Sequence, residues 1–373
     1  MGKGQVHTLD FQVRRDRDTG ARVTRLTPAD RVCHRTYFYQ RCFSADGQQL
    51  LFGGNLDGGP DWHYHLLDLS TRRATQLTEG AGENTFGGFL SADDRRLWFV
   101  RAERELVCLE LGSLQERVVY RVPEGWVGYG TWVANSACTR MVGIEIHADD
   151  WFELDDWRKF ALMFEARPRC RLIRIDLASG AREVIHERQG WLGHPQYRPF
   201  DDHTVAFCHE GPHDRIDARI WFVDEDGGRV RCGREHAPGE SCTHEFWVPD
   251  GSAMVYVSLQ RGESTRRICR LDPVTLQSTV LTEMPPCSHL MSNHDGSLIV
   301  GDGSSGDPYL HLFDLRRGSQ RALARHDSSW RVLYGNRQVT HPHPSFSPDE
   351  RSVLYTSDVD GEPALCLADL AIE

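Results

Sequence analysis

The sequence lacks several patterns that would each define a class of protein. Its 373 residues include 11 cysteines, an odd and scattered set without a C-x-x-C pair, which argues against a disulfide framework and a thiolate zinc site. No apolar run approaches the roughly 18 residues of a membrane span. The first six residues have no signal-peptide core and no myristoylation motif. We therefore expect a cytoplasmic protein with free thiols and no membrane partner.

Two further absences narrow the function. The net charge is −11 and no Lys/Arg run occurs, so the chain has no footprint for nucleic acid. An anionic ligand would need a locally cationic pocket. The sequence also has no G-x-S-x-G elbow, which argues against a serine hydrolase.

A repeated unit dominates what is present. Each copy has an alternating strand, a turn of the Asp-Gly type, a second strand, a third strand ending in a pattern such as Leu-Asp-Leu, and a short last strand. Seven such copies open at or near Phe43, Phe89, Trp132, Tyr197, Phe246, Leu290 and Phe346. Periods of about 40–55 residues with four short strands are typical of propeller blades. The sequence predicts an all-β, seven-bladed β-propeller as one domain over residues 1–373.

The two ends of the chain predict how the ring closes. The last copy stops at Cys366–Leu370, one strand short of a blade. Residues 18–27 resemble the fourth-strand segment of the first copy at residues 69–78. Pairing the N-terminal strand with the last blade would remove the open edges.

One segment departs from the strand pattern. Trp151, Leu154, Trp157, Phe160 and Phe164 have helical spacing inside the third copy. We expect a helical insertion in the third blade at residues 146–170. It would either cover a blade edge or a subunit contact, or act as a lid over a binding site.

A histidine-rich stretch near the C-terminus indicates a metal site. His341 and His343 are two residues apart, so on an extended segment both imidazoles leave the backbone on one side. Gln338 offers a neutral oxygen nearby. His289 is the candidate fourth ligand, because it shares a repeat position with His343.

The repeat also relates a further histidine to this stretch. His244, His289 and His343 each stand six residues before an Asp-Gly or Asp-Glu turn. Innermost propeller strands line a central channel, so equivalent residues project toward a shared axis. A single such histidine is typically a hydrogen-bonded core residue, but the recurrence together with Gln338 favours a metal. Three imidazoles and an amide oxygen leave the charge of the ion uncancelled, which suits an anionic ligand and permits zinc, iron, nickel or manganese.

Two arginines are further cation candidates. Arg219 and Arg198 carry the planar fork that suits a carboxylate. The alternative for each arginine is an ion pair with a nearby Asp such as Asp214 or Asp217.

Four segments carry a resemblance to a known family: residues 209–214, 241–247, 287–289 and 338–346. Together with residues 128–132, they resemble oligogalacturonate lyases, polysaccharide lyase family 22. The resemblance implies a cytoplasmic seven-bladed propeller that binds manganese through three His and one Gln and cleaves short oligogalacturonates by β-elimination. Residue by residue, it implies metal ligands at His289, Gln338, His341 and His343, a base at His244, and Arg219 beside the substrate.

The remaining expectations follow from this resemblance. We assign Arg198, His209 and His213 as candidate substrate-binding residues, whereas residues 32–40 follow the family pattern only in part. The predicted reaction releases 4,5-unsaturated uronate and monomeric products during pectin degradation, with manganese or another divalent ion. A metal-dependent lactonase or sugar isomerase and a non-catalytic propeller scaffold are the alternatives. No pattern predicts an oligomeric state.

Overall fold

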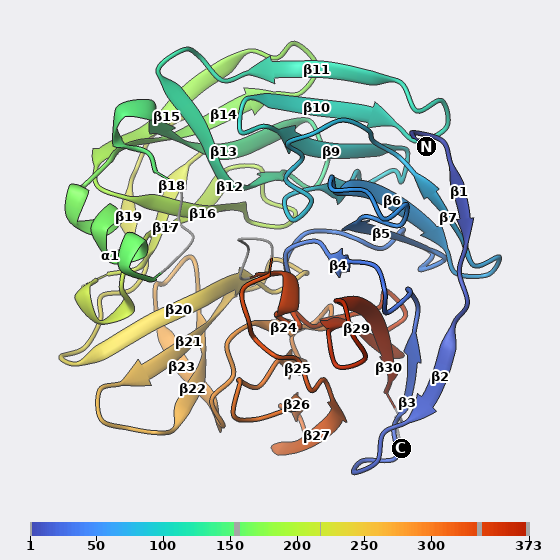
Figure 1. Cartoon of the computed structure of the whole chain (residues 1–373). Helices are drawn as coiled ribbons and strands as arrows, with labels where there is room; N and C mark the ends of the chain where they lie inside the picture. The colour runs from blue at the N-terminus through green and yellow to red at the C-terminus, as the bar shows by residue number, and fades with distance from the viewer. Residues whose placement is uncertain (1, 153–156, 217, 334–337, 371–373) are drawn as a thin grey trace. The chain divides into compact units, whose positions relative to one another are not determined.

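A computed structural model of the chain describes residues 2–152, 157–216, 218–333 and 338–370. Over these residues the chain forms seven antiparallel sheets of four or five strands each. The described part contains a single α-helix and three 3-10 helices. The chain is therefore a seven-bladed β-propeller, as predicted (Figure 1).

Each sheet consists largely of consecutive strands. The first, in the order β1-β7-β6-β5-β4, contains β1 (Val6–Thr8), β4 (Cys33–Arg35), β5 (Gln49–Gly54), β6 (His63–Asp68) and β7 (Arg73–Gln76). The second contains β8 (Phe89–Leu90), β9 (Arg96–Arg101), β10 (Glu105–Glu110) and β11 (Glu116–Arg121). The third contains β12 (Trp126–Ala134), β13 (Arg140–His147), β14 (Arg169–Asp176) and β15 (Arg182–Gln189).

The later sheets follow the same plan. The fourth contains β16 (Leu192–Tyr197), β17 (Thr204–His209), β18 (Ile220–Asp224) and β19 (Arg231–Cys232). The fifth contains β20 (Glu240–Trp247), β21 (Met254–Gln260), β22 (Arg266–Leu271) and β23 (Ser278–Met284). The sixth contains β24 (Leu290–Ser292), β25 (Leu298–Gly301), β26 (Tyr309–Asp314) and β27 (Ser319–Arg325). The seventh, in the order β2-β3-β30-β29-β28, contains β2 (Gln12–Arg15), β3 (Arg22–Arg25), β28 (Ser345–Phe346), β29 (Ser352–Ser357) and β30 (Ala364–Asp369).

The seventh sheet confirms the predicted closure. Strand β3 pairs antiparallel with β30, Val23 opposite Ala368 and Arg25 opposite Cys366. In Figure 1 the dark blue β2 and β3 lie beside the dark red β30. The prediction missed two strands, because β2 adds a fifth strand here and β1 pairs with β7 in the first sheet.

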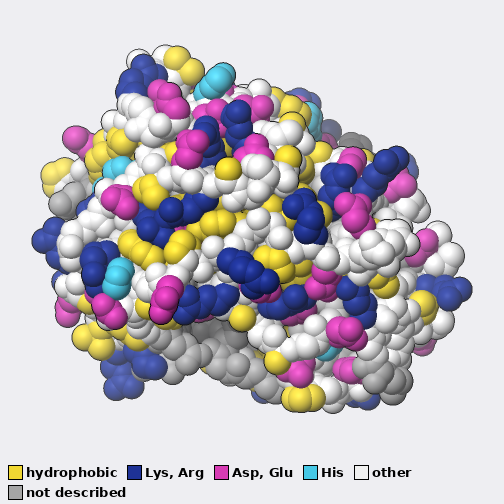
Figure 2. All heavy atoms as spheres, turned by 90° about the horizontal axis from the view of Figure 1, so that it is seen from above, with side chains coloured by type: hydrophobic (Ala, Val, Ile, Leu, Met, Phe, Trp, Pro, Cys, Tyr) yellow, Lys and Arg dark blue, Asp and Glu magenta, His cyan; other side chains and the backbone are white. Residues whose placement is uncertain are grey.

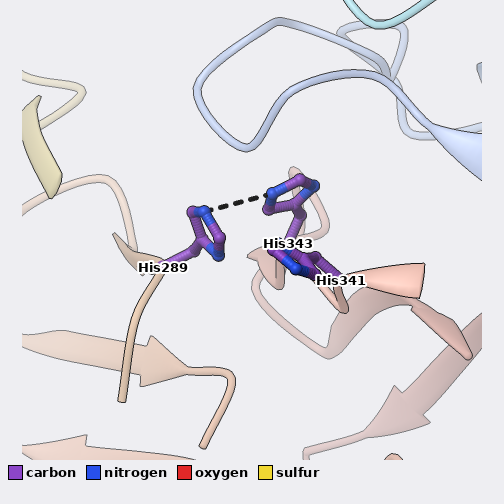
Figure 3. Close-up of side chains that lie close together, drawn as sticks. All are labelled: His289, His341 and His343. Carbon is purple, nitrogen blue, oxygen red and sulfur yellow. Dashed lines mark hydrogen bonds between the residues drawn. The ribbon is translucent and has the colours of Figure 1, made fainter. Parts of the chain in front are cut away.

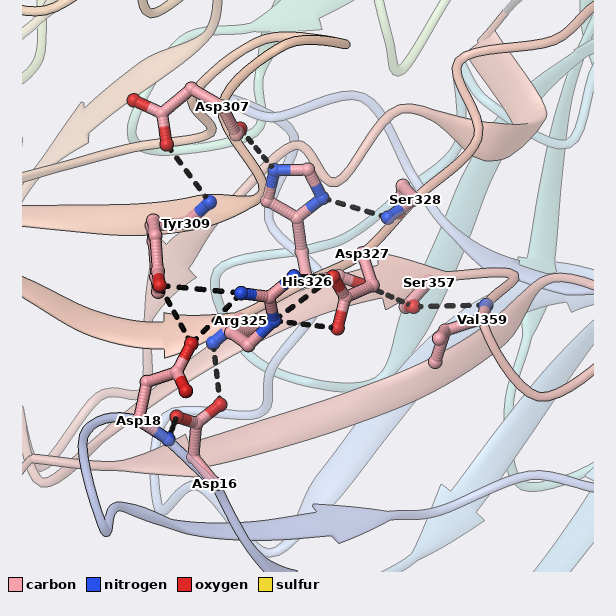
Figure 4. A network of polar contacts seen from close by, with 10 residues as sticks. All are labelled: Asp16, Asp18, Asp307, Tyr309, Arg325, His326, Asp327, Ser328, Ser357 and Val359. Atoms are coloured by element: carbon pink, nitrogen blue, oxygen red, sulfur yellow. Dashed lines mark hydrogen bonds and ion pairs between the residues drawn. The ribbon is translucent and has the colours of Figure 1, made fainter.

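Polar contacts tie this N-terminal segment to the sixth sheet as well (Figure 4). The Arg325 backbone N–H donates to Asp16 at 2.7 Å, and its guanidinium donates to Asp18 at 2.8 Å. The hydroxyl of Tyr309 donates to the same Asp18 carboxylate at 2.6 Å. The first strands are thus held by two successive blades.

The Asp-Gly turns owe their recurrence to one local bonding pattern. Ser44 Oγ donates to Asp46 at 2.6 Å and accepts the Gln49 N–H at 2.9 Å, which closes the hairpin. Gly47 has φ 70°, a conformation that favours glycine. The same Ser-to-Asp bond recurs at residues 91–93 and 347–349.

The predicted insertion is present between β13 and β14. It contains the 3-10 helix η1 (Ala148–Asp150) and the helix α1 (Trp157–Ala166). Trp151, Phe160 and Phe164 pack against the buried cluster that includes Trp191. Leu154 lies outside the described residues.

The chain divides into two compact units. Unit 1 comprises Met1–Ala102, Cys108–Glu116 and Pro286–Glu373, and unit 2 comprises Glu103–Val107 and Arg117–Pro285. Each unit has its own apolar core, exemplified by Val300, Leu310 and Tyr355 in unit 1 and by Phe222, Tyr256 and Met254 in unit 2. The prediction of one domain remains a prediction.

Surface features agree with the composition. On the face shown in Figure 2, Lys and Arg side chains are interspersed with Asp and Glu. All 11 cysteines carry free thiols. No helix among the described residues is long and apolar enough to cross a membrane.

Candidate active site

Three predicted ligands come together in unit 1. His289 directly precedes β24, and His341 and His343 precede β28. One ligand atom from each lies within 4.8 Å of the others, and Figure 3 shows the three rings turned toward a common space. His289 and His343 are 4% and 1% exposed. The blade repeat therefore juxtaposes imidazoles that are 54 residues apart in the chain.

The nitrogens of this cluster fit a divalent ion. Nε2 of His343 lies 3.3 Å from Nε2 of His289. A neutral imidazole has one protonated and one bare nitrogen. Two nitrogens that each bind one ion at about 2 Å lie about 3 Å apart. The pair therefore has the chemistry and the spacing of two ligands to one metal.

A buried carboxylate fixes which nitrogen of His289 is bare. Asp302, fully buried directly after β25, lies 2.7 Å from Nδ1 of His289 through Oδ2. Its other oxygen accepts the backbone N–H groups of Ser288 and His289. We assign the His289 proton to Nδ1, so that Nε2 faces His343 with its lone pair. The sequence reasoning missed Asp302, although residue 302 falls opposite residue 289 in the hairpin that pairs Leu290 with Gly301.

The first blade completes the wall around these rings. Tyr37 lies edge-on to His343 with ring centroids 5.3 Å apart, and Phe38 lies 5.5 Å from His289. The buried guanidinium of Arg35 donates to the backbone oxygen of His343 and to Ser345 Oγ. These residues belong to the segment with the weakest family resemblance, so the resemblance gave no signal for them.

The expected geometry of the histidine stretch is wrong in one respect. Residues 341–344 form no strand, and His343 has φ 47°, which is left-handed rather than extended. Gln338 begins the 3-10 helix η3 (Gln338–Thr340), whose last turn is closed by a 3.2 Å bond from the His341 N–H to the Gln338 oxygen. Helix and left-handed turn, not strand alternation, bring His341 and His343 together. Arg337 lies outside the described residues.

Residues with a left-handed backbone conformation also occur in unit 2, in the first strands of the fourth and fifth blades. His194 and His244 have φ 47° and 54°, and each lies where the pairing of its strand shifts register. A bulge at this point redirects a side chain, and non-glycine residues in this conformation concentrate at functional sites. His244 thus shares its backbone conformation with His343, and the structure adds His194 as a residue that the sequence reasoning missed.

His244 is half-buried beside a second imidazole. Thr243 Oγ1 lies 3.1 Å from His244 Nδ1 and 3.3 Å from His213 Nε2. The His213 and His244 rings are 6.2 Å apart at 75°. Burial, reinforced by Arg219, lowers the pKa of His213 to about 4, so His213 is neutral near pH 7.

Arg219 lies between two buried glutamates. Its Nε donates to Glu245 at 2.7 Å and its Nη1 to Glu210 at 3.0 Å. Burial alone would raise the pKa of Glu210, but Arg219 and His194 hold it well below its ordinary value. Nη2 of Arg219 has no hydrogen-bond partner in the described part of the chain.

The other residues proposed from the sequence as substrate contacts or ion-pair partners have contacts of their own. Arg198 donates to the Gly251 oxygen at 2.8 Å and lies 3.4 Å from Asp201, so it closes a turn. Asp214 lies 3.8 Å from Arg261 and not beside Arg219. Asp217 lies outside the described residues. His209, at the end of β17, stacks on Trp221 and accepts a bond from Arg188.

A second cluster with metal-ligand atoms occurs in unit 2. His194, Cys208 and Glu210 place one ligand atom each within 4.8 Å of the others. Glu210 is already paired with Arg219 at 3.0 Å and lies 3.1 Å from His194. Burial raises the pKa of the Cys208 thiol well above its ordinary value. A protonated thiol next to a guanidinium disfavours a bound cation here.

The sequence and the fold of the chain are similar to those of known proteins. Residues 1–372 match the sequence model of a family described as oligogalacturonate lyase. An oligogalacturonate lyase of Dickeya dadantii (strain 3937) is 58% identical over 382 aligned residues, covering 99% of this chain and 98% of the relative.

Solved structures give the same result. A structure described as oligogalacturonate lyase in complex with manganese has a TM-score of 0.97 and 59% identity, covering 99% of this chain and 98% of the other. An oligogalacturonate lyase from Vibrio parahaemolyticus has a TM-score of 0.95 and 56% identity, with 98% of each chain covered. Similarity of this extent, over nearly the whole length and with the predicted imidazoles clustered, leaves one conclusion: the chain belongs to the oligogalacturonate lyase family.

Proposed function

We propose that the chain is an oligogalacturonate lyase that cleaves short galacturonides by β-elimination and acts in the cytoplasm with manganese. The observation that carries the proposal is the cluster of His289, His341 and His343, one of them oriented by buried Asp302, in a member of this family. The similarity to a lyase structure described as a manganese complex supports the choice of ion.

The ligand set suits the substrate. His289, His341, His343 and Gln338 would hold the ion, and all four side chains are uncharged ligands. An ion bound there supplies positive charge that stabilises the negative charge developing on a uronate carboxylate. Asp302 contacts His289 at Nδ1, and the ligand cluster found among the described residues contains no carboxylate.

The protein's own groups then account for the bond changes. Arg219, a permanent cation with Nη2 available, binds the substrate carboxylate. A neutral His244 takes the proton from C5 of the uronate. The C5–H electron pair becomes the C4=C5 double bond, and the C4–O bond breaks with its electrons on the departing oxygen. Arg198, His209 and His213 are further candidates for substrate contact.

A product assay tests the function directly. Manganese-loaded protein incubated with digalacturonate is expected to give one 4,5-unsaturated uronate per bond cleaved, detected by the ultraviolet absorbance of the conjugated double bond and by a mass equal to that of an intact uronate minus water. A lactonase or an isomerase would leave the glycosidic bond intact, and a scaffold would leave the substrate unchanged. Cleavage without unsaturation would contradict the proposal.

Asp302 allows a test of how His289 is oriented. Asp302→Asn keeps the shape but removes the carboxylate that holds the proton on Nδ1, so we expect manganese affinity to fall about 10–100-fold. Activity should recover at high manganese concentration, because the ligands themselves remain. The matched control is Asp295→Asn, an exposed turn residue of the same blade. Unchanged affinity in Asp302→Asn would contradict the orienting role.

A further inference from the structure

A cavity in unit 2 is lined by residues that take no step in the proposed reaction, although His209 is a candidate for substrate contact and Glu210 pairs with Arg219. Its volume is about 580 Å³, within the range of small-molecule sites. Helix α1 supplies one wall, and β15, β17 and β18 supply others. The residues that matter to the argument are Phe164, Arg167, Arg188, Trp191, His209 and Trp221. Neither Arg219 nor His244 is among the described residues that line it.

The charged side chains that line this cavity leave positive charge unbalanced. Arg215 is paired with Glu165 at 2.8 Å, and Glu210 with Arg219 at 3.0 Å. In the described part of the chain no carboxylate lies within ion-pair distance of Arg167 or Arg188. Burial and then Arg167 itself lower the pKa of the Arg188 guanidinium. Two like charges thus face one space, which an anion would relieve.

His209 does not neutralise the charge of Arg188, but its ring fixes the direction of the Arg188 side chain. The Nη1 group of Arg188 donates to Nε2 of His209. Burial, followed by Arg188 and His186, lowers the pKa of His209 to about 3, so its ring is neutral and accepts this bond. His209 in turn stacks on Trp221, with ring centroids 4.4 Å apart at 26°. The guanidinium is therefore held against a fixed aromatic pair.

Trp191 also lines the cavity and is 2% exposed. Its indole nitrogen is closed off from solvent, so Trp191 contributes an apolar wall to the cavity and not a hydrogen-bond donor.

We propose that the cavity beneath α1 is a second binding site, separate from the reaction site, for a carboxylate-bearing sugar of one or two residues. Arg188 and Arg167 bind the carboxylate, and Trp221 and Phe164 supply apolar contact to the sugar ring. The anionic character of the ligand rests on the two arginines. The choice of a uronate rests on the proposed function. The helical insertion is then one wall of a binding site as well as a cover for the sheet.

Galacturonate is a suitable probe, since it has no glycosidic bond to cleave. Calorimetric titration of manganese-loaded protein with galacturonate should show a class of sites, separate from any binding at the manganese, whose affinity falls tenfold or more in Arg188→Gln. Arg121→Gln is the matched control, because that arginine is 69% exposed and paired with Glu105. Circular dichroism checks that each variant is folded. Galactose, which lacks the carboxylate, should not compete.

Each other outcome has a defined meaning. Equal galacturonate affinity in wild type and Arg188→Gln, in protein that still cleaves digalacturonate, overturns the second site and leaves the lyase function intact. If inorganic phosphate binds more tightly than galacturonate, the sugar-acid assignment is wrong. If Arg188→Gln raises the KM for trigalacturonate by the factor by which it weakens galacturonate, the cavity is part of the reaction site and the inference fails.

Discussion

Replacing His341 by alanine is expected to abolish tight manganese binding and lyase activity while the protein stays folded. His341 is one of three imidazoles whose ligand atoms lie within 4.8 Å of one another. Losing a direct ligand should weaken binding by more than the 10–100-fold typical of losing an orienting group. The blades supply the core independently of the ion, so circular dichroism should be unchanged. Metal content after dialysis and unsaturated product together measure the effect.

His289→Ala is expected to differ from His341→Ala in one informative way. It should also lose the ion, but it leaves the Asp302 carboxylate buried, with the backbone N–H groups of Ser288 and His289 as its remaining donors among the described residues. A buried charge stripped of a partner is costly, so this variant should unfold at lower temperature as well. His294→Ala, an exposed histidine of the same blade, is the control. Full metal content in both site variants would refute the centre.

Chelation gives a check that needs no substitution. Removing divalent ions should stop unsaturated product from forming, and manganese should restore it. Failure of every divalent ion to restore activity would contradict a catalytic metal.

The blade pattern was predictable because it depends on local chemistry. Each turn is closed by bonds within a few residues, as Ser44, Asp46 and Gly47 show. The closing strand was predictable because residues 18–27 resemble the fourth-strand segment of the first copy, and the last copy lacks a fourth strand. Val23 to Arg25 take that place beside β30. Strands β1 and β2 have no counterpart in the repeat, so repetition gave no signal for them.

The clustering of these histidines was predictable for the same reason, whereas the residues that support them were not. His289 and His343 recur at one repeat position, but Asp302 acts through tertiary pairing of β24 with β25. The left-handed φ of His343 contradicts the extended segment expected from spacing. Backbone conformation at such a residue is imposed by surroundings, here the Arg35 contact to its oxygen, which the local sequence does not encode.

Arg219 illustrates how distant residues decide a role. The sequence offered Asp214 or Asp217 as partners because they are near in the chain. In the structure Glu210, directly after β17, and Glu245, in β20, pair with the guanidinium instead. Two carboxylates hold its fork in place, and among the described residues Nη2 has no hydrogen-bond partner. This arrangement agrees with the proposed role of a positioned cation.

His244→Asn is the second variant with a large expected effect, because it separates a base from a ligand. His244 shares the left-handed conformation of His343, so a role as a further metal ligand is the competing assignment. Thr243 and His213 lie beside its ring. A base also needs a bare nitrogen that coordination would occupy. We therefore expect the variant to keep its manganese and its substrate affinity.

The rate of His244→Asn should fall by about 10²–10⁴-fold, the range typical for losing a general base. Asparagine preserves much of the shape and polarity, so KM should change little while kcat carries the loss. His203→Asn, an exposed histidine in a turn of the preceding blade, should keep full activity. Wild-type activity should decline toward acid pH as an imidazole base becomes protonated, and this decline should be absent from the residual activity of His244→Asn. A variant that turns over normally, or that has lost its manganese, would show that His244 is not the base.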